Sequence, residues 1–172
     1  RPPDPGRSGI QSGREERGVT ASPVTLLEAV RNHWSWKGLE AVEILGFNPF
    51  GNLLVRSSSD QVWRIIPEEP EARPVAGTLA EFESLRSDPG FLRDWEMEML
   101  YDVARTRLGP LAGGQSYCLK VPAVLGGVYD ASNLALIDSA ELIGSSGDLA
   151  RQIDHLPDGT RVRLKPTPVR LP

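Results

Sequence analysis

Residues 41–66 read AVEILGFNPFGNLLVRSSSDQVWRII, and this stretch decides the fold class. Three short apolar runs, at 41–47, 52–57 and 61–66, are separated by the turn-forming clusters NPFG and SSSD. Runs of this length joined by short turns predict an antiparallel meander. In the third run the apolar residues do not alternate cleanly with polar ones, which indicates that both sides of that strand are at least partly covered.

Helices are predicted on both sides of the meander. Upstream, apolar residues at a spacing of three to four give residues 24–33 one apolar side. Downstream, PEEPEARP at 67–74 is predicted to be irregular, because its three prolines block both a helix and a strand ladder. A helix is then predicted to begin at Thr78, where Thr78 and Glu81 form a capping box, and to end near Arg86.

A longer helix is predicted over residues 88–108. Asp88 and Pro89 provide a cap and a first-turn proline, apolar residues recur every three to four positions, and Gly109 ends the helix. The remaining elements are predicted as a strand at 133–139, a helix at 146–155 and a terminal strand at 161–165. These elements predict an α+β fold, with an antiparallel sheet of about five or six strands and helices packed mainly on one face.

Composition indicates one globular domain. Hydrophobic residues make up 40% and charged residues 24% of the 172-residue chain, and we expect a flexible tail at 1–23 followed by a single domain at 24–172. No apolar run approaches the ~18–20 residues of a membrane span, so no membrane contact is expected. The single cysteine, Cys118, excludes an internal disulfide. Together with an N-terminus unlike a signal peptide, this favours a cytoplasmic protein.

The negative charge is concentrated in the middle of the chain. Residues 67–102 contain ten acidic and three basic residues and so carry −7, whereas the whole chain carries −4. We call residues 67–102 the acidic block. It argues against a nucleic-acid binder, which needs clustered Lys and Arg, and it suits a basic partner. The alternative interpretation is a solvated helix surface.

The segment GPLAGGQS at 109–116 comes close to a phosphate-binding loop. Gly109, Gly114 and Ser116 have the spacing of a Walker A motif, but Gln115 stands where the motif needs Lys. The segment also follows a predicted helix and precedes a predicted strand, which is the reverse of the required order. We therefore interpret residues 109–127 as a helix stop, a strand and two turns. Its predicted core residues are Leu111, Tyr117, Leu119, Val121 and Leu125.

No catalytic, cofactor-binding or metal-binding residue is predicted. His33 and His155 lie in no metal-ligand pattern, and Cys118 fits a small core position in a strand better than a nucleophile. Trp34 and Trp36 could stack on a ligand, but packing of a helix end on the sheet is the preferred interpretation. Glu68, Glu69 and Glu71 lack the spacing of a calcium loop.

Several short segments occur in a distinctive order between residues 45 and 150. They are Phe50-Gly51-Asn52, Val62-Trp63-Arg64, Gly109-Pro110-Leu111, Gly114-Gln115-x-Tyr117 and Pro122-x-x-Leu125-Gly126-Gly127. In this order the chain resembles the C-terminal domain of type VI secretion system immunity proteins, of the type that gives immunity against a DNase toxin. The resemblance implies a non-catalytic antitoxin that binds a cognate secreted effector toxin in the cytoplasm.

The charge pattern adds a hypothesis about where a toxin binds. Toxins that act on nucleotides or nucleic acids have basic active sites, and an acidic surface can occupy such a site by mimicking phosphate. The candidate toxin-binding residues are Glu68, Glu69, Glu71, Asp94, Glu98 and Asp102. Two other classes remain open, namely a ligand- or peptide-binding scaffold without a toxin partner, and an enzyme that uses Cys118.

Overall fold

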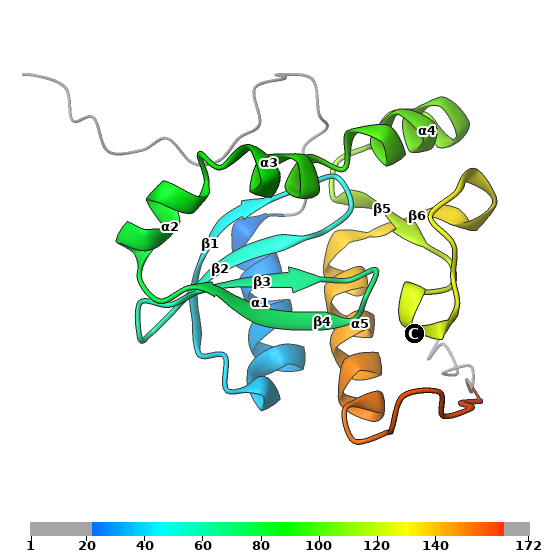
Figure 1. The fold of residues 1–172 in the computed structure, drawn as a ribbon. Coiled ribbons are helices and arrows are strands. Elements are labelled where there is room, and N and C mark those ends of the chain that lie inside the picture. The colour runs from blue at the N-terminus through cyan, green and yellow to red at the C-terminus, as the bar shows by residue number, and fades with distance from the viewer. Residues whose placement is uncertain (1–21, 164–172) are drawn as a thin grey trace, which may run out of the picture.

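The computed structural model describes residues 22–163, and its largest element is a four-stranded antiparallel sheet (Figure 1). The strands follow the chain in the order β1-β2-β3-β4. Their bounds are β1 Ala41–Phe47, β2 Leu53–Ser57, β3 Val62–Ile66 and β4 Glu71–Ala76. The predicted meander is confirmed as β1 to β3, and β4 extends it by one strand.

The fourth strand lies where the sequence predicted irregular structure. In β4, Pro74 stands opposite Trp63 of β3, so the prediction for 67–74 was wrong from Glu71 onward. The reason is position in the sheet. β4 is an edge strand, with a neighbour on one side only, and an edge tolerates a residue that has no N–H to donate.

Helices cover both faces of this sheet. In β2, Leu53 and Val55 pack in one core cluster with residues of α1 (Pro23–Trp34) and α5 (Ser139–Ile153). Leu54, which points to the other face, packs with residues of α2 (Leu79–Leu85) and α3 (Pro89–Glu96). Successive strand residues point to opposite faces, so a strand with consecutive buried residues needs two covering layers. The α+β class is confirmed, with the helices divided between the two faces.

The other two strands form a separate sheet beside the first. β5 (Gln115–Leu119) pairs with β6 (Leu134–Asp138) in an antiparallel hairpin, and α4 (Glu98–Leu108) packs against it. Residues 22–163 therefore contain six strands, within the expected number of about five or six, but they are divided between sheets of four and two. Tyr117 of β5 donates its backbone N–H to the Pro49 carbonyl at 2.9 Å and so links the hairpin to the turn between β1 and β2.

The helix predicted over 88–108 is two helices. Met97 adopts a left-handed conformation with φ 47° and separates α3 from α4. The side chain of Asn48 donates from Nδ2 to the Trp95 carbonyl at 2.8 Å, which satisfies an otherwise unpaired acceptor at the end of α3. The break therefore depends on a residue almost fifty positions away.

The last helix begins earlier than predicted. α5 starts at Ser139, where the Asp138 carboxylate accepts from the amides of Ala140 and Glu141 at 2.9 and 3.0 Å. The prediction placed the start at 146, where Ser146, Gly147 and Asp148 were interpreted as the opening of the helix. In the structure Gly147 allows close helix packing. A Cβ on Gly147 would lie 2.7 Å from the His33 carbonyl oxygen of α1.

The two ends of the chain fall partly outside the described residues. Of the predicted tail at 1–23, residues 1–21 lie outside, and Pro23 already begins α1 with Ser22 as its cap. Of the predicted strand at 161–165, residues 161–163 are in no strand and the other two lie outside. The division into a tail and a single domain stays a prediction.

Candidate functional site

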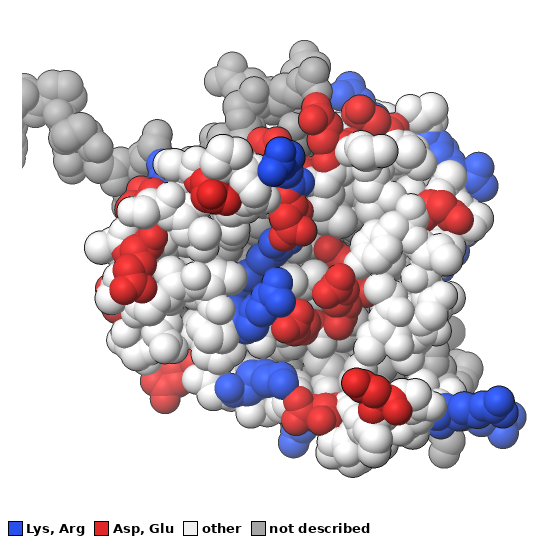
Figure 2. Space-filling model, viewed as in Figure 1, with Lys and Arg blue, Asp and Glu red and all other residues white. Residues whose placement is uncertain are grey.

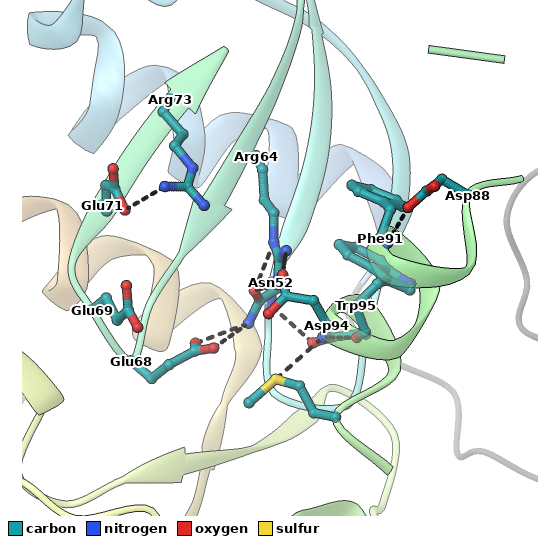
Figure 3. Close-up of polar contacts among 12 residues, drawn as sticks. Asn52, Arg64, Glu68, Glu69, Glu71, Arg73, Asp88, Phe91, Asp94 and Trp95 are labelled. Atoms are coloured by element: carbon teal, nitrogen blue, oxygen red, sulfur yellow. Dashed lines mark hydrogen bonds and ion pairs between the residues drawn. The ribbon is translucent and has the colours of Figure 1, made fainter. Parts of the chain in front are cut away.

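Glu68, in the turn between β3 and β4, faces inward. Its side chain is 8% exposed, and its two carboxylate oxygens accept from Nδ2 of Asn52 at 3.0 and 2.8 Å (Figure 3). Burial raises the pKa of Glu68, while the Asn52 amide and the nearby Arg64 act in the opposite direction. Glu68 was predicted as a surface charge for toxin binding, and the structure instead gives it a buried position joining two segments of the fold.

Arg64 on β3 is the centre of the same cluster. Its guanidinium is 4% exposed and donates from Nε and Nη2 to Oδ1 of Asn52 at 3.2 and 2.9 Å. It also forms an ion pair with Asp94 of α3 and lies 5.6 Å from the ring centre of Trp95. We call Asn52, Arg64, Glu68 and Asp94 the polar network. Charge-assisted hydrogen bonds and the aromatic face compensate for burying the cation.

The turn before β2 positions Asn52. Oδ1 of Asn48 accepts from the amides of Phe50 and Asn52 at 2.9 and 3.0 Å, which folds the turn back on itself. Gly51 has φ +73°, and a Cβ there would lie 2.7 Å from Cδ2 of Leu142. The turn thus needs both the Asn48 side chain and a glycine.

The remaining predicted acids lie at the surface. Glu69 is exposed and accepts from the Tyr129 hydroxyl at 3.2 Å, and Glu71 lies 3.6 Å from Arg73. The side chain of Asp94 is 66% exposed despite its ion pair. The fold brings Glu68, Glu69, Glu71 and Asp94 to one region (Figure 3), whereas the exposed Glu98 and Asp102 lie on α4.

Several carboxylates of the acidic block also have local structural roles. Glu81 accepts from the Gly77 amide at 2.8 Å, Glu83 pairs with Arg86, and Asp88 caps α3. On the face of the molecule shown in Figure 2, Lys and Arg side chains (blue) lie among the acidic side chains (red). Glu81, Glu83 and Asp88 nevertheless stay exposed, and the −7 already counts Arg86, so these contacts do not remove charge from the surface. Net charge alone does not define the partner surface.

An open cleft of about 360 Å³ lies between α5, the β5–β6 hairpin and the β3–β4 turn. Its lining is mainly apolar and includes Phe50, Leu119 and Leu142. Glu68 and Cys118 also line it. Cys118, predicted as a core residue, is only half-buried. Burial and the nearby Glu141 carboxylate raise the pKa of its thiol, so the reactive thiolate is disfavoured.

The histidines and the glycine-rich segment have structural positions. Nδ1 of His33 on α1 lies 2.8 Å from Oδ1 of Asp148 on α5, while His155 is exposed. Within residues 22–163 no group of three or more His, Cys, Asp or Glu side chains is arranged to hold a metal ion. Over the same residues, no helix combines the length and the apolar character needed to cross a membrane.

The helix stop, first turn and strand predicted within 109–127 are confirmed, whereas the predicted second turn contains a short 3-10 helix at Ala123–Leu125. Gly109 has φ +81° directly after α4, and the Tyr117 hydroxyl donates to its carbonyl at 2.6 Å. Of the predicted core residues, Tyr117 and Leu119 are buried, whereas Val121 is 42% exposed. The prediction for Val121 was wrong, because it lies beyond the end of β5 in a surface loop.

Arg64 and Asn52 occur in two of the segments that carried the family resemblance, but neither was predicted as a site residue. A signal for Arg64 was present, since a lone arginine in the apolar run QVWRII indicates a buried charge that needs partners. No comparable signal identifies Asn52, because its role depends on the two elements that meet at its amide.

The fold and the polar network define a mixed α+β protein whose buried polar side chains join separate elements. Residues 76–150 match the family model described as "T6SS immunity protein Tdi1, C-terminal". The resemblance expected from the sequence is confirmed over these residues. Three of the five segments that carried it lie in the matched region, whereas those at 50–52 and 62–64 precede it.

A solved structure has the same fold. The crystal structure of Atu4351 from Agrobacterium tumefaciens matches with a TM-score of 0.52 at 16% sequence identity. The match covers 75% of this chain and 65% of that one, so the chain spans less than two thirds of the length of its structural relative. The comparison with curated proteins finds no match.

Proposed function

We propose that this chain is an immunity protein that binds and neutralises a cognate secreted bacterial effector toxin. The match of residues 76–150 to an immunity-protein family carries the proposal. That region includes α2, α3, α4 and the β5–β6 hairpin, and with Asp94 of α3 it contributes one member of the polar network.

The chemistry of the described residues supports binding rather than catalysis. The polar network is held by internal hydrogen bonds between its own members, as expected for a group that fixes structure. The Cys118 thiol has a raised pKa, which is opposite to the shift that activates a nucleophile. These observations favour the antitoxin over an enzyme that uses Cys118.

Neutralisation is proposed to occur by occlusion of the effector's active site in the cytoplasm. Exposed carboxylates, among them Glu69, Glu98 and Asp102, can steer the chain toward a basic cleft. Once bound, the chain excludes substrate by its bulk. A scaffold without a toxin partner would share the fold but not this effect.

The test is protection of growing cells. The product of the gene next to the one for this chain is the expected effector, and it is expressed from an inducible promoter in a bacterial host, alone or with the full chain. We expect growth arrest with the effector alone and normal growth when the chain is present. An effector variant without its catalytic residue is the control for expression burden. Growth arrest that persists despite good expression of the chain would refute the proposal.

A further inference from the structure

Exposed apolar side chains gather in the loop between β5 and β6. Val121, Val124, Val128 and Tyr129 expose 42%, 52%, 53% and 45% of their surface. We call these four residues the apolar loop patch. Single exposed apolar residues are normal on a protein surface, whereas contiguous exposed apolar surface marks an interaction site. These four large side chains lie within nine residues of one loop.

This loop is held in one conformation by its own contacts. Asn133 Nδ2 donates to the carbonyls of Val121 and Val128, both at 2.9 Å, and its Oδ1 accepts from the Val121 amide. A Cβ on Gly127 would lie 1.7 Å from the Val121 carbonyl oxygen, so only glycine allows the backbone at 127 to pack this closely against the backbone at 121. A surface fixed in this way loses little conformational entropy when it binds.

The apolar loop patch borders the acidic turn between β3 and β4. The Ala123 amide donates to the Glu68 carbonyl at 2.8 Å, and the Tyr129 hydroxyl donates to Glu69. Burial and the negative charges of Glu68, Glu69 and Asp94 raise the pKa of Tyr129, as expected when carboxylates lie close to a phenol. Within residues 22–163, Glu69 has no Lys or Arg in an ion pair with it.

We infer that the apolar loop patch, together with Glu69 and Asp94, forms the surface that docks the protein partner. This inference rests on the proposed function and gives the effector surface a chemistry, namely apolar side chains flanked by Lys or Arg. Apolar contacts exclude water at the centre of an interface, and complementary charge at its rim sets orientation. A second copy of this chain fits less well, because it would bring the same carboxylates together.

The first test compares two double variants of the full chain. V124S/V128S makes the patch polar, whereas V24S/V42S changes exposed valines on α1 and β1, which are 66% and 38% exposed. Binding to the purified, catalytically inactive effector encoded by the neighbouring gene is measured by calorimetry. We expect Kd to rise about tenfold or more for the patch variant and less than about twofold for the control.

A charge test uses matched neutral substitutions. E69Q removes the charge but keeps an oxygen that accepts from Tyr129. E28Q removes one carboxylate charge from α1 and is the control. We expect E69Q to lower the association rate and reduce its dependence on salt, and E28Q to leave both unchanged. Equal effects of E69Q and E28Q would overturn the acidic part of the inference.

Failure of the inference can be told apart from failure of the proposed function. If the unaltered chain does not bind the effector, both are refuted. If it binds and the two valine variants bind equally well, only the docking surface is refuted. The docking surface is also refuted if sedimentation shows that the unaltered chain is a dimer and that V124S/V128S dissociates it, because the patch would then bind a second copy of the chain. Hydrogen exchange on the unaltered complex provides an independent check, because protection is expected at residues 121–129 and protection confined to other segments would overturn the inference.

Discussion

At the scale of single residues, the structure depends on buried polar side chains that hydrogen bond to one another. Glu68 is 8% exposed, and burial raises its pKa above the ordinary value of 4.5. The folded chain therefore keeps a proton that the unfolded chain releases at the same pH. The stabilisation linked to this proton is fully present below the unfolded pKa and is lost as pH rises through the folded pKa.

Replacing Glu68 by glutamine is expected to remove this pH dependence. Glutamine cannot ionise and keeps an oxygen that accepts from Asn52. As pH rises above 4.5, the free energy of unfolding should fall less for E68Q than for the unaltered chain, because only the unaltered chain loses the stabilisation linked to this proton. The measurement is urea denaturation at a series of pH values above 4.5, with E69Q at the exposed neighbouring position as control. Parallel curves for all three proteins would contradict the raised pKa.

Replacing Asn48 by alanine should be strongly destabilising. The substitution removes the acceptor for the Phe50 and Asn52 amides and the donor to the Trp95 carbonyl. Each buried group left without a partner costs about 1 kcal/mol or more, so a loss of about 2–4 kcal/mol is expected. The exposed Asn32 on α1 provides the matched control, since N32A should change stability by less than about 0.5 kcal/mol. Equal losses for N48A and N32A would show that Asn48 does not hold the turn.

At the scale of elements, the sequence predicted local structure well and contacts between elements less well. The strands at 41–66, the Thr78 cap of α2 and the end of α4 at Gly109 follow from local pattern and were correct, although Glu81 accepts from the Gly77 amide and not from that of Thr78. The break at Met97 and the early start of α5 were missed. The first depends on Asn48 from another segment, and the second includes glycines whose role is to contact α1. Residues whose structure depends on distant partners carry no local signal.

The packing of α1 on α5 gives a prediction at this scale. In G147A the new methyl group would lie 2.7 Å from the His33 carbonyl oxygen and 2.9 Å from Nε1 of Trp34, so the two helices must separate. Alanine is otherwise the better helix former, so a loss of stability can come only from this contact. We expect a loss of about 1–3 kcal/mol in urea denaturation. Q152A, at an exposed position on α5, is the control and should be neutral. A stabilised G147A would refute the close approach.

At the scale of the whole molecule, the predicted α+β class was correct, but the functional surface could not be read from charge. The acidic block suggested six candidate residues. The structure buries Glu68, pairs Glu71 and Asp94 with arginines, and leaves Glu69 beside an apolar loop. Val121 was predicted to be in the core and instead belongs to the apolar loop patch. Sequence pattern identifies which residues are apolar or charged, whereas their exposure depends on how the sheets and helices of residues 22–163 meet.

The central claim is that this chain neutralises an effector by binding it directly. Its most direct test is calorimetric titration of the full, unaltered chain into the purified, catalytically inactive effector encoded by the neighbouring gene. The account predicts a one-to-one complex with a Kd in the nanomolar range, as is typical of stable interfaces of standard size. The absence of binding at about 10 µM of both proteins, with each shown to be folded, would contradict it.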